Sequence, residues 1–112
     1  MLLLEANPFV KLQFENTTIT SNLIGNYNFT NICAAVIIGK YFNVDCESIK
    51  KGIEAYIPEN NRSQIINKGS NKIILDAYNA NPSSMHVALT SFSSLKAAKK
   101  IVLLGDMFEL GE

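Results

Sequence analysis

The architecture of this chain is set by the run Leu75-Asp76-Ala77-Tyr78-Asn79-Ala80-Asn81-Pro82-Ser83-Ser84-Met85. It lies between two short apolar runs, 73–75 and 101–104, whose length and β-branched content predict buried strands. Asn81 is a favourable N-cap residue, and Pro82 then occupies the first helical position, where its missing N–H costs nothing. The order strand, loop, helix, strand predicts a β-α-β unit with a parallel sheet, so the expected fold class is α/β.

Hydrophobic periodicity predicts the elements that precede this unit. Asn28 or Thr30 can cap the first of the predicted helices, and Asn43 can end it in the left-handed conformation. The domain boundary is expected at a turn between Asn67 and Lys72, which divides the chain into residues 1–68 and 69–112. The predicted elements are strands at 9–14, 18–21, 64–66 and 72–76, and helices at 28–42 and 47–55.

Composition excludes several classes of function. The ten basic and ten acidic side chains cancel, so neither a nucleic acid nor an anionic membrane is an expected partner. The N-terminal apolar run stops at Glu5, too early for a signal sequence or a membrane span. Cys33 and Cys46 are expected as free thiols in the cytoplasm, and with His86 as the one histidine no metal site is predicted.

Two asparagines at the start of the first helix are candidate ligand-binding residues. Asn28 and Asn31 are three positions apart, so they lie on nearly the same side of a helix. An amide offers both a donor and an acceptor, which is what the N6/N7 edge of adenine requires. The alternative is that both are helix-start caps.

Arg62 and Asp76 are further candidates, each next to a predicted strand. Arg62 can bring a planar, charged fork to a phosphate or stack on a base; the alternative is an ordinary surface arginine. Asp76 follows a strand at the end where open α/β sheets bind ligands, and it could accept hydrogen bonds from ribose hydroxyls. The alternative for Asp76 is a loop-structuring role through local backbone N–H groups.

Four blocks of this sequence form a recognisable set: residues 22–31, 60–64, 76–85 and 104–112. Together they resemble the Mur ligases, the ATP-dependent amide-forming enzymes of bacterial cell-wall synthesis. The strings Tyr27-Asn28 and Tyr78-Asn79-Ala80-Asn81-Pro82 are similar to the member that adds D-alanyl-D-alanine. The likeness extends from about residue 9 to the end of the chain.

The resemblance implies a function for the chain and roles for its candidate residues. The expected reaction joins D-alanyl-D-alanine to a UDP-N-acetylmuramoyl tripeptide, with ATP and Mg²⁺, in cytoplasmic peptidoglycan synthesis that supports cell shape and division. Asn31 would hold adenine with the support of Asn28, while Arg62 and Asp76 would contact the nucleotide. Asn79 and Asn81 would lie near the nucleotide, although Asn81 is also a strong candidate for a helix cap.

The resemblance also implies that the chain corresponds to part of such an enzyme. Residues 1–68 would be the end of a central P-loop-type ATP-binding domain, and residues 69–112 the start of a Rossmann-like C-terminal domain. The phosphate-binding pattern Gly-x-x-x-x-Gly-Lys-Ser/Thr does not occur in the sequence. We therefore expect the chain to be inactive as a ligase by itself, with no catalytic residue assigned and the role of Asp106 open.

Two rival interpretations remain. The chain could be a non-catalytic α/β module whose strand-end loops bind a nucleotide or a protein partner. It could also belong to another amide ligase of the same fold, such as the folate-polyglutamate type, although the string from Tyr78 to Met85 argues against that.

Overall fold

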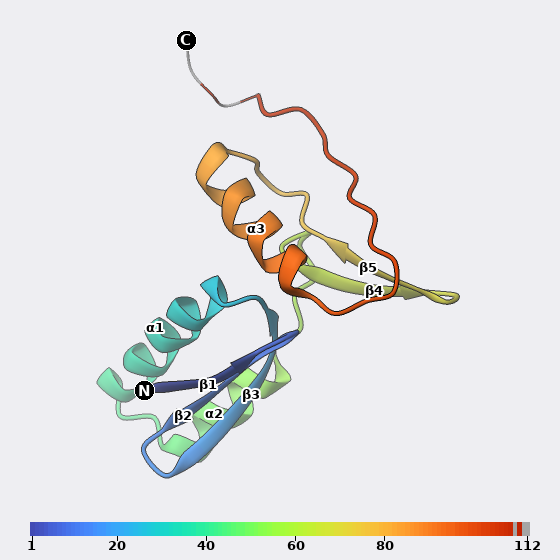
Figure 1. Ribbon diagram of the computed structural model, residues 1–112. Coiled ribbons are helices and arrows are strands. Elements are labelled where there is room, and N and C mark those ends of the chain that lie inside the picture. Colours follow the sequence, from blue (N-terminus) through green and yellow to red (C-terminus); the bar gives the residue numbers. More distant parts are fainter. Residues whose placement is uncertain (109, 111–112) are drawn as a thin grey trace. The chain divides into compact units, whose positions relative to one another are not determined.

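The chain forms two compact units, Met1–Pro58 and Glu59–Glu112, in a computed structural model that describes residues 1–108 and 110. Both contain a small antiparallel sheet and at least one helix, so the predicted mixed α/β class is confirmed. The elements, shown in Figure 1, are β1 (Leu2–Ala6), β2 (Phe9–Phe14), β3 (Thr17–Ile24), α1 (Tyr27–Tyr41) and α2 (Cys46–Ala55), followed by β4 (Gln64–Lys68), β5 (Asn71–Leu75) and α3 (Pro82–Ser94).

The first unit holds the hydrophobic core. Its sheet has the order β1-β2-β3, with antiparallel pairing at both interfaces. Alternation along β2 and β3 directs every second side chain to one face, and the two helices supply the apolar residues that pack against it. Burying such a side chain stabilises the fold by about 1.5–3 kcal/mol. The core consists of Val10, Leu12, Ile19, Ile32, Val36 and Ile49.

The two helices of the first unit have well-defined ends. Asp45 caps α2 by accepting a hydrogen bond from the Ser48 backbone N–H at 2.9 Å, and bonding to Ser48 lowers the pKa of this carboxyl. Asn43, beyond the end of α1, has φ of 59°, as predicted. The expectation that Asn28 caps α1 is wrong, because α1 begins at Tyr27 and the Asn28 side chain donates to the Ile24 carbonyl.

The second unit consists of a β-hairpin and a helix. β4 and β5 form an antiparallel ladder in which Gln64 pairs with Leu75 at one end and Lys68 pairs with Asn71 at the other. Gly69 takes a positive φ of 60° in the turn. Asn81 and Pro82 start α3 as predicted, with a capping box in which the Asn81 side chain accepts from the Ser84 N–H at 2.8 Å.

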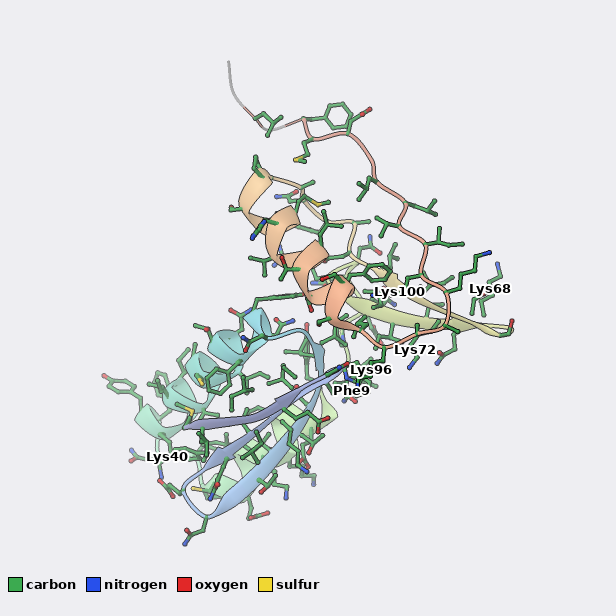
Figure 2. The ribbon with its side chains drawn as sticks, viewed as in Figure 1. Phe9, Lys40, Lys68, Lys72, Lys96 and Lys100 are labelled. Carbon is green, nitrogen blue, oxygen red and sulfur yellow. The ribbon has the colours of Figure 1, made fainter. Side chains whose placement is uncertain are left out.

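The end of α3 is also capped. Lys100, labelled in Figure 2, donates from Nζ to the carbonyl oxygens of Phe92, Ser93 and Leu95 at 3.3, 2.6 and 3.1 Å. A cation at this position complements the partial negative charge of a helix C-terminus. The segment that follows α3 is therefore folded back onto the last turn of that helix.

The predicted parallel β-α-β unit is wrong in two respects. Residues 101–104 form no strand and are exposed, and β5 pairs instead with β4 in an antiparallel hairpin. A strand requires a partner for its backbone groups, and apolar content alone does not supply one. Of the predicted motif at 104–112, positions 109, 111 and 112 lie outside the described residues.

The division into compact units lies at a different place from the predicted domain boundary, which stays a prediction. It falls between Pro58 and Glu59, before β4, whereas the sequence placed it in the turn after β4. A division at that turn would separate two strands that are hydrogen-bonded along their whole length. Arg62 and Asp76 consequently lie in the same unit, and no closure of one domain on another is needed to bring them together.

Candidate functional site

Asn28 and Asn31 form a hydrogen-bonded pair at the start of α1. Asn28 is buried, and its Nδ2 donates to the Ile24 carbonyl at the end of β3 at 2.8 Å. Its Oδ1 accepts from Nδ2 of the exposed Asn31 at 3.0 Å. Asn28 therefore restrains the Asn31 amide through this hydrogen bond, in which the Asn31 oxygen takes no part.

A cavity of about 330 Å³ adjoins Asn31 between α1 and α2. Its walls are mainly apolar, and its volume lies at the lower end of the range for small-molecule pockets, about 300–1,000 Å³. Apolar walls with one oriented amide suit a flat heterocycle that carries donors and acceptors on its edge. The lining residues are Leu23, Asn31, Ile32, Ala35, Gly52, Ile53 and Tyr56.

Side-chain bonds from β3 hold the cavity's α2 wall in place. Asn22 Nδ2 donates to the carbonyls of Glu54 and Tyr56, at 2.8 and 3.2 Å. The Thr20 N–H donates to Glu54 Oε1 at 3.0 Å. These bonds satisfy carbonyls at the end of α2 and fix Tyr56 next to the cavity. This role of Asn22 was not predicted from the sequence, although Asn22 belongs to the first of the four blocks that resemble the family.

A larger, more open hollow of about 590 Å³ lies over the polar face of α2. Its lining includes Glu47, Lys50 and Lys51, which carry exposed or half-exposed charged groups. None of the predicted site residues borders it. We therefore assign the candidate site to the cavity at Asn31.

The second unit brings Arg62 and Asp76 together at the open end of its hairpin. Asp76 Oδ1 accepts from the Ser63 backbone N–H at 3.0 Å, and the Ala77 N–H donates to the Asn61 carbonyl at 2.7 Å. These two bonds continue the pairing of β4 and β5 beyond the strands. The loop-structuring role weighed for Asp76 is thus one that its carboxylate performs here.

The loop that carries Arg62 has an unusual backbone. Asn61 and Ser63 have positive φ values of 59° and 52°, a conformation that is uncommon outside glycine and is often found at functional sites. Ser63 is buried, whereas Arg62 between them is exposed. The guanidinium carbon of Arg62 lies 3.9 Å from the centroid of the Tyr78 ring. Tyr78 belongs to a predicted motif, but its contact with Arg62 was not predicted from the sequence.

The remaining predicted residues follow β5. Asn79 is exposed in the segment between β5 and α3. Asn81 Oδ1 accepts from the Ser84 N–H and from the Ser83 hydroxyl, at 2.8 and 2.7 Å. The structure thus gives Asn81 a capping role, while the ligand roles of both asparagines stay predictions.

The first unit also contains a cluster of Glu15, Lys40 and Cys46. Cys46 Sγ donates to Glu15 Oε2 at 3.3 Å, and Lys40 Nζ lies 3.6 Å from Glu15 Oε1 and 3.8 Å from the sulfur. The hydrogen bond to Glu15 raises the pKa of the Cys46 thiol, with a further contribution from the negative charge of that carboxylate. Cys33 and Cys46 are both free thiols.

The described part of the chain comprises residues 1–108 and 110. This part of the chain holds no group of three or more His, Cys, Asp or Glu side chains that could bind a metal ion. It also contains no helix with the length and apolar content that crossing a membrane requires.

Similarity to known proteins points to one family. Residues 61–112 match the family described as "Mur ligase, glutamate ligase domain". The chain is 37% identical over 110 residues to the UDP-N-acetylmuramoyl-tripeptide–D-alanyl-D-alanine ligase of Bacillus subtilis, covering 96% of this chain and 24% of that protein. It is 38% identical over 95 residues to the ligase of the same name from Buchnera aphidicola, covering 84% and 20% of the two chains.

A solved structure gives the same result. A ligase from Acinetobacter baumannii, titled "UDP-N-acetylmuramoylalanyl-D-glutamyl-2,6-diaminopimelate–D-alanyl-D-alanyl ligase", superimposes with a TM-score of 0.70 and 29% sequence identity, covering 84% of this chain and 22% of that one. The chain thus spans about a quarter or less of the length of these relatives. On the agreement of the sequence motifs, the relatives and the superposition, the chain belongs to the Mur ligase family.

Proposed function

We propose that this chain forms the adenosine-binding part of an ATP-dependent ligase that joins D-alanyl-D-alanine to a UDP-N-acetylmuramoyl tripeptide in peptidoglycan synthesis. The observation that carries the proposal is the similarity, over most of the chain, to relatives that bear this name. On this view the first unit is the end of the central ATP-binding domain, and the second is the start of the C-terminal domain. We also infer that the ligase works in the cytoplasm.

Asn31 is the residue that we assign to the adenine base. Its amide is oriented by Asn28 and borders a mainly apolar cavity, so the base can be enclosed while its edge is recognised. A well-placed amide that bonds the adenine edge contributes about 1–3 kcal/mol of discrimination against other bases. Asn28 acts on the base through Asn31, which makes it a positioning residue.

Arg62 and Asp76 are assigned to the ribose and phosphate side of the nucleotide, with Asn79 nearby. An ionised carboxylate has about four acceptor sites, so Asp76 can accept from ribose hydroxyls while it bonds the Ser63 N–H. Arg62, held against Tyr78, presents a preorganised fork that suits phosphate oxygens. Asn81 supports the start of α3 in this proposal, next to the same loop.

The residues present suit the adenosine part of ATP and not its magnesium ion. The described residues include no carboxylate cluster of the kind that binds a metal, and the sequence contains no phosphate-binding Gly-Lys-Ser/Thr motif. We therefore assign no residue of this chain to Mg²⁺. In the complete ligase, ATP supplies the energy for amide-bond formation.

The alternative function is binding of a nucleotide or a protein partner without catalysis of ligation. A non-catalytic module that binds a nucleotide or a protein partner would use the same oriented amide and the same cavity. The observation that favours it is the lack of a phosphate-binding motif in the sequence. We prefer the ligase, because the named relatives match over 84–96% of the chain.

Nucleotide titration tests the proposal. Backbone NMR signals of the ¹⁵N-labelled chain should shift on addition of ATP at Asn31, Arg62 and Asp76. Asn31→Asp removes the amide donor and should weaken ATP binding by about 10- to 100-fold, as expected for the loss of one good base contact. Equal binding of ATP and GTP by the original chain would contradict adenine recognition.

A ligation assay separates the ligase from the module. The chain alone, given ATP, the tripeptide and D-alanyl-D-alanine, should form no product, because it lacks a phosphate-binding motif. Substituting Asn31 in a complete ligase that contains this sequence should raise the KM for ATP and leave the KM for D-alanyl-D-alanine nearly unchanged. A ligase unaffected by that substitution would favour the module.

A further inference from the structure

Two glycines within the helices of the first unit have opposite surroundings. A Cβ at Gly39 in α1 would lie 2.9 Å from Ile49 Cγ1, so close packing of α1 on α2 explains that glycine. A Cβ at Gly52 in α2 would meet no neighbouring atom within 4 Å among the described residues. Instead, Gly52 lines the cavity next to Asn31.

Neither backbone conformation nor packing requires a glycine at position 52. The residue lies inside α2, where the right-handed helical conformation is open to every residue except proline. Glycine is a poor choice there, since it loses the most backbone entropy when a helix forms. The open space beside Gly52 would accept a methyl group at no steric cost in this structure. What glycine uniquely provides is a bare backbone wall on the α2 side of the cavity.

The opposite side of the same cavity carries the recognition group. Asn31 projects from α1 with its amide fixed by Asn28, and Tyr56 and Ile53 extend the α2 wall. Ala35 contributes another small side chain to the lining. Small residues on both helices therefore leave a mainly apolar space, with the Asn31 amide as a polar group at its edge.

We propose that Gly52 is a specificity-determining residue, which keeps this cavity open for the face of a planar purine whose edge is read by Asn31. The inference rests on the proposed function. It extends that function to Gly52, which has no side chain that could hydrogen-bond to the base. A side chain at position 52 would fill the space proposed for the purine ring. The same side chain would stabilise the folded chain, because glycine is unfavourable inside a helix.

Two substitutions and one control test this opposition between folding and binding. Gly52→Ala should raise the Tm of the chain by about 4 °C, the order expected for a helix-interior glycine in a small domain, and weaken ATP binding by about tenfold. Gly52→Leu should abolish measurable ATP binding. The control Lys51→Leu adds a leucine at the neighbouring exposed position of α2, and it should leave ATP affinity within about twofold of the original.

The measurements are a thermal melt and an NMR titration with ATP and with adenosine. A lower Tm for Gly52→Ala would show a structural need for glycine and overturn the inference. Unchanged ATP binding by Gly52→Leu would overturn it too and leave the proposed function intact. If ATP shifts the signals of Arg62 and Asp76 but leaves Asn31 and Gly52 unaffected, the cavity is not the base site and the inference fails. Shifts nowhere in the original chain would overturn the proposed function as well.

Discussion

The guanidinium group of Arg62 and the ring of Tyr78 close the open end of the β4–β5 hairpin, with 3.9 Å between the guanidinium carbon and the ring centroid. One residue precedes β4 and the other follows β5. An isolated two-stranded hairpin is marginally stable in water, so contacts that join its ends carry weight. The same contact holds the guanidinium in place before any ligand arrives.

Removing this cation–π contact should destabilise the second unit slightly. A double-mutant cycle with Arg62→Ala and Tyr78→Ala should give a coupling free energy of about 0.5–1 kcal/mol, the range for exposed pairs. Tyr78→Phe keeps the ring and serves as the control, with little loss of stability. The measurement is urea unfolding followed through signals of the second unit. Additive single-mutant effects would show that the contact contributes nothing.

Asp76 should affect both stability and nucleotide binding. Asp76→Ala removes the charged acceptor of the Ser63 N–H, and a hydrogen bond to a charged group contributes about 1.5–3 kcal/mol to the free energy of unfolding. Asp76→Asn retains an acceptor and should cost less, yet weaken ATP binding by about 10- to 100-fold, because the bond to the ribose is no longer charge-assisted. If Asp76→Asn reduced stability but left ATP affinity unchanged, Asp76 would have a structural role in its loop and no role in binding the ribose.

Asn81 should act on the start of α3. Asn81→Ala removes the acceptor of the Ser84 N–H and should cost about 1 kcal/mol, whereas Asn81→Asp retains a capping oxygen and should cost far less. Hydrogen exchange of the first-turn amides of α3 reports the loss directly. Weaker ATP binding by Asn81→Asp, with the cap intact, would point to a ligand contact in addition to the cap.

Cys46 should react slowly with alkylating agents at mildly alkaline pH. Glu15 raises the pKa of its thiol, so the neutral form is favoured in the folded chain. The associated stability is fully present below the ordinary thiol pKa and is lost as the pH rises through the raised value. In a Cys33→Ala background, Glu15→Gln should increase the rate of reaction with iodoacetamide at pH 8.5 by about twofold or more. A slower reaction of the Glu15→Gln variant would show that Glu15 does not raise the pKa of the Cys46 thiol.

Elements encoded within a few neighbouring residues were predictable from the sequence. Asn81 and Pro82 specify the start of α3, and the alternation from Phe9 to Phe14 specifies β2, because capping and side-chain period act locally. The left-handed Asn43 follows from the same local chemistry.

Features that depend on distant partners were not predictable. The run 101–104 has the composition of a strand, yet no strand forms there, while Leu2–Ala6 becomes β1 by pairing with β2. Asparagine is a favoured residue for a helix N-cap, yet Asn28 lies inside α1 and donates a hydrogen bond to the Ile24 carbonyl. For the candidate site, the spacing of Asn28 and Asn31 was informative, but the cavity and Gly52 depend on how α1 packs against α2.

Gly39 allows α1 to approach Ile49 of α2 closely, because a Cβ at position 39 would lie 2.9 Å from Ile49 Cγ1. α1 and α2 are pressed together at this point, and further along the same helices they border the cavity that contains Asn31 and Gly52. A side chain at position 39 would force Ile49 or the helices to move, since real Cβ atoms essentially never come within 3.0 Å of another side-chain atom. We therefore expect Gly39→Ala to alter the cavity that these helices border, although position 39 does not line it.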